Sequence, residues 1–110
     1  MDIFKIEDMK GGWFVGNFTP VVFQTKEFEV CLARHKKGDR WATHYHQIAT
    51  EINLLIRGEM SIQNQRLKAG DIFVIHPGEV ADPVFHEDCE VVVVKTPSIP
   101  GDKYEVTGDP

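Results

Sequence analysis

Hydrophobic and polar residues alternate along this chain in short runs, as they do in β-strands. Residues 28–34 carry apolar side chains at every second position, whereas residues 72–75 and 91–94 are continuously apolar. Alternation predicts a strand with one packed face, and a continuous apolar run predicts a strand that is buried on both faces. Turn residues recur about every eight to twelve positions, which is typical of β-sandwiches and barrels. The pattern therefore predicts an all-β chain.

Glycines mark several of the expected turns. We expect Gly38, Gly58 and Gly78 to adopt turn conformations with positive φ, which glycine accepts because it has no Cβ. Arg57 and Gly58 separate two strand-like runs, residues 51–56 and 60–63, so they predict a two-residue hairpin. The next turn is expected at residues 64–66.

Length and composition narrow the function classes. A chain of 110 residues with 42% hydrophobic and 26% charged residues is expected to form a single domain, residues 1–110. A net charge of −5 argues against nucleic acid and anionic membranes as partners. With neither a long apolar run nor the pattern of a signal peptide, the expected location is cytoplasmic. Cys31 and Cys89 are expected to be buried free thiols.

The candidate metal ligands are His44, His46 and Glu51. In an extended chain, side chains at i and i+2 leave the same face about 7 Å apart, close enough for two imidazoles to share one ion. A neighbouring strand or bend could add the carboxylate of Glu51, which is costly to bury without a partner. Two histidines and one carboxylate suit a divalent transition metal with open coordination positions.

The spacing of Gly38, His44, His46, Glu51 and Gly58 resembles the first sequence motif of the cupin superfamily. Residues 70–78 resemble the start of the second motif, and the resemblance places the core motif region at 38–96. It implies an antiparallel double-stranded β-helix, or jelly-roll barrel, that binds one divalent metal such as Fe, Mn, Zn or Ni. Many cupins are also homodimers.

The resemblance is incomplete at the third histidine of cupins. That position falls on Ala81, with Asp82 next to it. In strict alternation Asp82 would face away from the metal, although Pro83 or a bulge could re-aim its side chain. Asp82 is therefore a candidate ligand or catalytic acid–base group. Trp41 and Tyr45 flank the histidines and are candidate substrate-binding residues.

Three functions fit these residues. The first is a metal-dependent cupin enzyme, a dioxygenase, isomerase, epimerase or lyase, that acts on a small polar molecule such as a sugar derivative or short acid. The second is a non-catalytic binding module for a sugar or small acid, and the third is a scaffold or interaction barrel. A homodimer is expected in each case, since residues 1–23 carry more apolar surface than they can bury alone.

Overall fold

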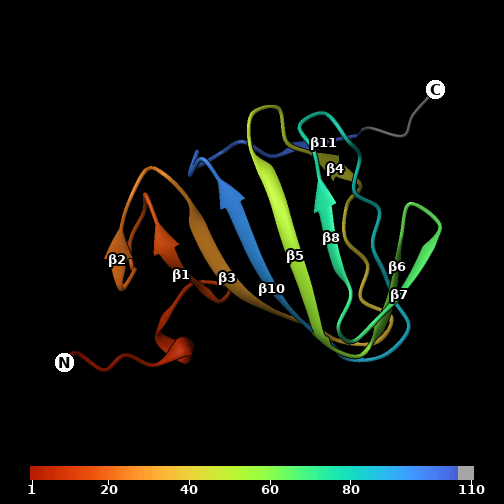
Figure 1. The fold of residues 1–110 in the computed structure, drawn as a ribbon, viewed down its shortest axis with the longest axis horizontal. Helices are drawn as coiled ribbons and strands as arrows, with labels where there is room; N and C mark the ends of the chain where they lie inside the picture. Colours follow the sequence, from red (N-terminus) through yellow and green to blue (C-terminus); the bar gives the residue numbers. More distant parts are fainter. Residues whose placement is uncertain (107–110) are drawn as a thin grey trace.

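A computed structural model describes residues 1–106, and nearly all of their regular structure is β (Figure 1). A short 3₁₀ turn, η1 (Ile6–Asp8), precedes the strands. The strands are β1 (Trp13–Gly16), β2 (Phe23–Gln24), β3 (Glu29–His35), β4 (His44–Tyr45), β5 (Thr50–Arg57), β6 (Glu59–Ile62), β7 (Gln65–Lys68), β8 (Ile72–Ile75), β9 (Val84–Phe85), β10 (Cys89–Thr96) and β11 (Tyr104–Glu105). Within residues 1–106, no helix has the length and apolar character that crossing a bilayer requires.

The strands form a large sheet faced by two smaller ones. The six-stranded sheet has the order β2-β1-β3-β10-β5-β8, and its neighbours are antiparallel except for β1 and β2. The pair β11-β4 and the three-stranded sheet β7-β6-β9 complete the second layer, which lies behind the large sheet in Figure 1. This arrangement is the double-stranded β-helix of the cupin fold, with its sheets remaining separate rather than closing into one barrel.

The hydrophobic core lies between the two layers. Side chains from the inner face of the large sheet meet others from β6 and β9, and the buried members are Cys31, Leu55, Met60, Phe85, Cys89, Val91 and Val93. Both cysteines are free and buried, as the sequence predicts. Burial raises the pKa of the Cys31 thiol to about 12, so this thiol stays protonated and behaves as a small apolar group.

The apolar runs are buried on one face rather than two. Strand β8 lies at the edge of the large sheet, and its outward side chains Ile72 and Val74 are 68% and 43% exposed. The prediction of burial on both faces is wrong for this strand, because no element within residues 1–106 covers the outer face of the sheet. In β3 the packed face is the unexpected one: Glu29 and Cys31 point inward, and Phe28 is 36% exposed.

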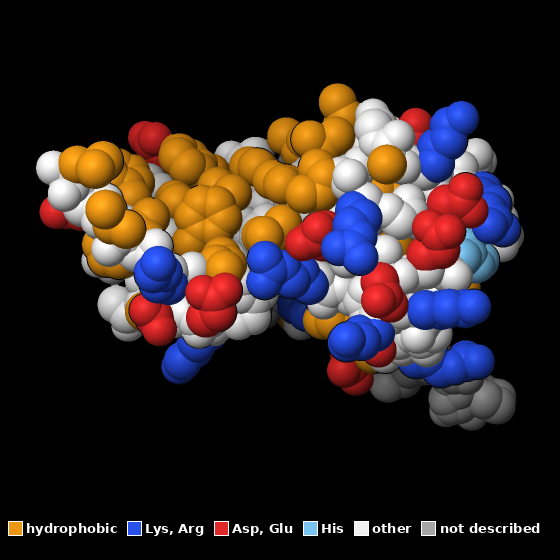
Figure 2. Space-filling model, turned by 90° about the horizontal axis from the view of Figure 1, so that it is seen from below, with side chains coloured by type: hydrophobic (Ala, Val, Ile, Leu, Met, Phe, Trp, Pro, Cys, Tyr) orange, Lys and Arg blue, Asp and Glu red, His pale blue; other side chains and the backbone are white. Residues whose placement is uncertain are grey.

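The outer face of the large sheet therefore carries two apolar rows. Strand register aligns Val30, Val94, Ile52 and Val74 in one row, and Leu32, Val92, Leu54 and Ile72 in the other. Figure 2, which views the molecule from below relative to Figure 1, shows hydrophobic side chains gathered at the left and along the upper edge, with charged side chains densest at the right. We call the eight residues of the two rows the outer apolar face.

The predicted glycine conformations are confirmed, but the hairpin at Gly58 is wrong. Gly38, Gly58 and Gly78 have φ values of 82°, 91° and 86°. Strand β5 pairs with β10 and β8, whereas β6 pairs with β7 and β9, so Gly58 is a corner that carries the chain from one layer to the other. The next turn comes earlier than expected, at Gln63 and Asn64, both of which have positive φ.

Candidate metal centre

His44 and His46 occupy one edge of the cavity between the layers. His44 lies in β4 and is held by backbone hydrogen bonds with Ala81 in both directions, 3.1 and 2.7 Å long. His46 follows the strand and is only 4% exposed. The two ring centroids are 5.4 Å apart, so the structure places both imidazoles on the same face, as the i, i+2 spacing predicts.

Each imidazole is oriented by a backbone carbonyl. Nδ1 of His44 lies 3.0 Å from the carbonyl oxygen of Ala42, and Nδ1 of His46 hydrogen-bonds the carbonyl oxygen of Asp102. When Nδ1–H of a neutral histidine donates to a carbonyl, Nε2 keeps the lone pair that a metal binds. Burial lowers the pKa of His44, which favours this neutral form.

Glu51 lies beside His46 on β5. Its Oε2 is 3.0 Å from Nε2 of His46, and Lys95 occupies the cross-strand position opposite Glu51. Burial alone would raise the pKa of Glu51, but the hydrogen bond and charge of His46 and the charge of Lys95 outweigh it, so the pKa is lowered. The bond to Glu51 raises the pKa of His46. A carboxylate that stays ionised next to an imidazole is a suitable ligand for a cation.

Asp102 is a positioning residue that sequence reasoning missed. Its buried carboxylate accepts hydrogen bonds from the backbone N–H groups of Gln47, Ile48 and Ala49, at 3.0, 3.1 and 2.9 Å. Burial opposes ionisation of Asp102, but these three donors lower its pKa. Asp102 thereby fixes the turn between His46 and Glu51, and its carbonyl orients His46. No sequence signal links residues that lie more than fifty positions apart.

The donor types suit a divalent transition metal, but the side chains do not converge on one position in this structure. Two imidazoles with oriented Nδ1 atoms and one ionised carboxylate match the ligand types of open mononuclear sites. In the structure His46 and Glu51 bond to each other, and within residues 1–106 no three His, Cys, Asp or Glu side chains converge as a metal cluster. Binding would require the His46 proton to leave, as metal ligation by histidine generally does.

The structure places Ala81 near the histidines and Asp82 away from them. Ala81 pairs with His44, is buried and lines the cavity, so the position expected for a third histidine carries only a methyl group. The Asp82 side chain is exposed and accepts a hydrogen bond of 2.7 Å from the backbone N–H of Gln63. This carboxylate supports the β6–β7 turn and is not among the residues that line the cavity.

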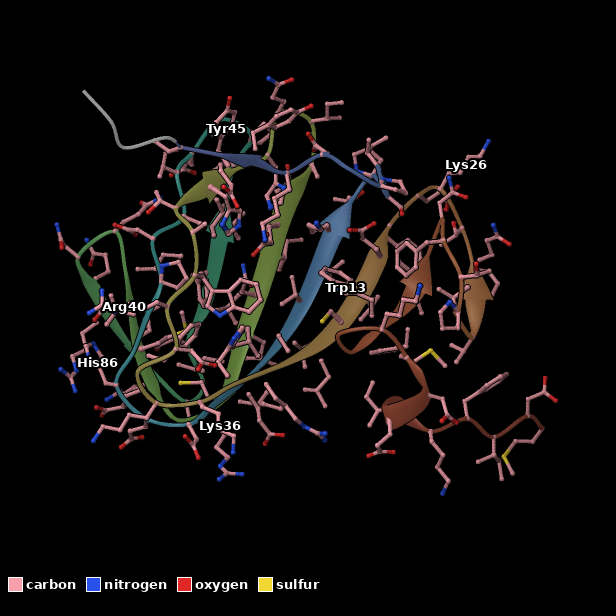
Figure 3. The ribbon with its side chains drawn as sticks, turned by 180° about the vertical axis from the view of Figure 1, so that it is seen from behind. Trp13, Lys26, Lys36, Arg40, Tyr45 and His86 are labelled. Carbon is pink, nitrogen blue, oxygen red and sulfur yellow. The ribbon has the colours of Figure 1, made fainter. Side chains whose placement is uncertain are left out.

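The two aromatic candidates are separated. Trp41 lines the cavity, and the Lys103 ammonium lies 5.1 Å from the centre of its ring. Tyr45 stacks on Tyr104 at 5.4 Å, and Figure 3 shows it at the β4–β11 end of the molecule. Tyr45 does not line the cavity, whereas Trp13 does.

The cavity has a volume of about 810 Å³ and a mixed lining. Next to Glu51, the Lys95 ammonium lies 3.1 Å from Glu29 and 4.9 Å from the centre of the Trp13 ring. The buried Glu29 also accepts a 2.7 Å hydrogen bond from the Ser98 hydroxyl. Most of the remaining lining, from β6, β8, β9 and β10, is apolar. A cavity of this size accepts a drug-sized molecule.

Structural comparison shows the same fold in several solved proteins. An uncharacterized conserved protein with a double-stranded β-helix domain from Klebsiella pneumoniae is 24% identical, covering 94% of this chain and 90% of its own, with a TM-score of 0.70. KdgF from Halomonas sp. is 21% identical over 69% of this chain and 74% of its own, with a TM-score of 0.62. The DMSP lyase DddQ from Ruegeria pomeroyi is 14% identical over 89% of this chain and 51% of its own, with a TM-score of 0.73. These identities support the fold alone.

Sequence comparison identifies the family. No functionally curated protein is similar enough in sequence to match. The family model described as the ChrR cupin-like domain matches residues 17–100, which include both motif regions, the histidines and Glu51. The match spans most of the chain and agrees with the double-stranded β-helix. The chain therefore belongs to the ChrR cupin-like domain family of the cupin superfamily.

Proposed function

We propose that this chain is a metal-dependent cupin enzyme that acts on a small molecule in its central cavity. One divalent metal would be held by His44, His46 and Glu51. The observation that carries the proposal is the orientation of both imidazoles by backbone carbonyls at Nδ1, which turns Nε2 of His46 toward the ionised carboxylate of Glu51 and leaves Nε2 as the ligating atom of each ring once His46 has lost its proton. Cupin folds that include named enzymes, such as a DMSP lyase, a polyketide cyclase and a sugar phosphate isomerase, support an enzymatic role.

The bound metal would supply Lewis-acid chemistry or an acidified water at the polar end of the cavity. Residues around the polar end of the cavity orient the proposed ligands and set their charge. Asp102 orients His46, and the hydrogen bond and charge of His46, together with the charge of Lys95, hold the pKa of Glu51 below its usual value. The methyl group of Ala81 stands where a further ligand would otherwise lie, which leaves room for substrate oxygens. A substrate that approaches through two oxygens suits this arrangement.

The location of Asp82 favours a second candidate function, a binding module without turnover. Its carboxylate serves the Gln63 turn rather than the cavity. The remaining charged side chains near Glu51 are already paired, since Glu29 bonds Lys95 and Ser98. A metal-loaded protein that holds a ligand unchanged would support this alternative.

A homodimer is also proposed, with the outer apolar face as its interface. This face remains open in one chain although its strands have the apolar sequence of doubly buried strands. Charged side chains of both signs lie at one end of the two rows. Arg34 and Arg57 are each within 4 Å of Glu90. A surface that is apolar in its centre and carries both charges at its rim can pair with a second copy of itself.

The cytoplasm is the proposed compartment. Cys31 and Cys89 are both free and buried, and a reducing environment keeps thiols in this state.

The double variant His44→Ala/His46→Ala is expected to lose divalent metal binding. Removing two of three ligands should raise the dissociation constant at least about a hundredfold, since even the loss of a group that only supports a ligand costs about ten- to a hundredfold. The measurement is elemental analysis and zinc titration of the purified protein. The matched control is His76→Ala/His86→Ala, which removes two histidines that do not line the cavity. Undiminished metal in the first variant would exclude this site.

A further inference from the structure

The charged groups of the cavity are concentrated at the end that holds the candidate metal ligands. Glu29, Lys95 and Glu51 occupy one row across β3, β10 and β5, and all three line the cavity. His46 bonds Glu51, and His44 lies next to His46. The side chains of Lys95 and Glu29 are only 15% and 6% exposed, so water screens these charges weakly. The charge of a ligand group that reaches this end therefore matters for its binding.

Beyond this row the wall of the cavity is mainly apolar. Strand alternation turns every second side chain of β3 and β10 toward the cavity. Strands β6, β8 and β9 add further apolar side chains from the other sides. The lining residues that β3 and β10 contribute next to the charged row are Cys31, Ala33, Val91 and Val93. A ligand with many hydroxyl groups, such as a sugar, would leave most of them unpaired against this wall.

The apolar wall is long enough for an extended ligand. Ala33 lies four residues from Glu29 on β3, which is roughly 13 Å along the strand. With carbon–carbon bonds of about 1.5 Å, an extended chain of about ten carbons spans a similar distance. The cavity volume of about 810 Å³ leaves room for such a chain. A short acid would cover the charged row and leave the wall in contact with water.

The charges at the polar end select one negative charge on the ligand. Glu29 and Lys95 form an ion pair of 3.1 Å and compensate each other. The neighbouring residues Asp102 and Lys103 also have opposite charges. The ionised Glu51 would compensate one of the two charges of a divalent metal, since histidine binds metals in its neutral form. One positive charge is then left for the ligand to neutralise.

We propose that the cavity binds a monocarboxylic acid with a long apolar body, such as decanoate. The carboxylate lies at the metal end, and the apolar body lies along the wall formed by β3 and β10. This substrate class deepens the proposed function. The place of the carboxylate rests on the proposed metal centre, whereas the fit of the apolar body to the wall does not.

The test compares four ligands by calorimetry on the zinc-loaded protein. Each methylene group that is buried strengthens binding about fourfold, so decanoate is expected to bind at least about fiftyfold more tightly than hexanoate. Decanol, which has the same chain but no charge, should bind at least about tenfold more weakly than decanoate. Decanedioate should also bind at least about tenfold more weakly, because its second carboxylate would lie unpaired against the apolar wall.

Ala33→Phe places a ring in the path of the apolar body. Ala33 lines the cavity at the far end of the proposed chain position, so decanoate is expected to lose at least about tenfold in affinity. Hexanoate, which ends before this position, should keep its affinity. Ala69→Phe is the matched control, because Ala69 is exposed in the turn before β8 and does not line the cavity. It should keep both affinities of the wild type.

The outcomes separate this proposal from the metal function. A zinc-loaded wild-type protein that binds decanoate no more tightly than hexanoate, decanol or decanedioate would overturn the proposal while the metal centre stands. That comparison needs no variant. A protein that takes up no zinc would refute the metal function instead. Decanol and hexanol are then compared on the metal-free protein: a clear preference for decanol supports the fit of the apolar body, and equal binding or no binding overturns it.

Discussion

Leu54→Arg is expected to convert the proposed homodimer into a monomer. Leu54 lies at the centre of the outer apolar face, between Val92 and Ile72 in the register of the sheet, and is 37% exposed in the single chain. In an interface with twofold symmetry the substitution occurs twice, and each guanidinium would be buried without a partner. We expect the dimer dissociation constant to rise at least about a thousandfold, which corresponds to about 4 kcal/mol.

The measurement is the sedimentation mass over a range of micromolar concentrations. Ile48→Arg is the matched control, because Ile48 is 53% exposed and lies in the turn before β5, outside the outer apolar face. It should keep the dimer mass. A wild-type protein that sediments as one chain would refute the dimer. A Leu54→Arg variant that remains dimeric would move the interface elsewhere, for example to the apolar residues of segment 1–23.

Gly58→Ala is expected to destabilise the fold by about 3 kcal/mol or more. Gly58 has φ of 91°, a conformation that costs about 1–2 kcal/mol for a residue with a Cβ. The added methyl group would also lie 2.3 Å from the Asp88 carbonyl oxygen and 2.8 Å from Cys89 Sγ. Because the backbone of β10 cannot easily move, overpacking adds about 1–3 kcal/mol.

Gly78→Ala separates the two causes. Gly78 has φ of 86°, but a Cβ there would meet nothing within 4 Å, so the expected loss is only about 1 kcal/mol. Both free energies of unfolding are measured by denaturant titration. Equal losses in the two variants would mean that the close approach of Gly58 to β10 does not contribute to stability.

Local chemistry explains why the fold class could be predicted. Strand alternation and turn residues depend on neighbours in sequence, so β3 and β10 and the positive φ of Gly38 and Gly78 follow from the pattern. Whether the chain stays in one layer or passes to the other at Gly58 depends on pairing between distant strands. A glycine between two strand-like runs is consistent with either a hairpin or a corner, and only the pairing of β5 with β10 and β8 distinguishes them.

The face of β3 that points inward depends on residues distant in the sequence. Phe28, Val30 and Leu32 form the more apolar face, yet Glu29 and Cys31 point inward. Glu29 is tolerated there because Lys95 and Ser98 neutralise and hydrogen-bond its carboxylate. Neither partner is close to Glu29 in the sequence. The apolar face is then left for the outside of the sheet, where the proposed second copy would cover it.

In the candidate site, too, the features that depend on neighbouring residues could be predicted, whereas those that depend on distant residues could not. The i, i+2 spacing places His44 and His46 together because it is a local property of an extended chain. Asp102 could not be found from spacing, since its role depends on hydrogen bonds between segments that are distant in the sequence. Asp82 adjoins the position of the missing ligand, yet strand alternation directs its side chain toward Gln63.

The most direct test of the metal centre is X-ray absorption spectroscopy of the zinc-loaded protein. We expect one zinc per chain with only nitrogen and oxygen neighbours near 2.0–2.2 Å and scattering from two imidazole rings. Loss of the imidazole scattering in His44→Ala/His46→Ala is expected as well. A sulfur neighbour near 2.3 Å, or an unchanged spectrum in the double variant, would contradict a metal centre built from His44, His46 and Glu51.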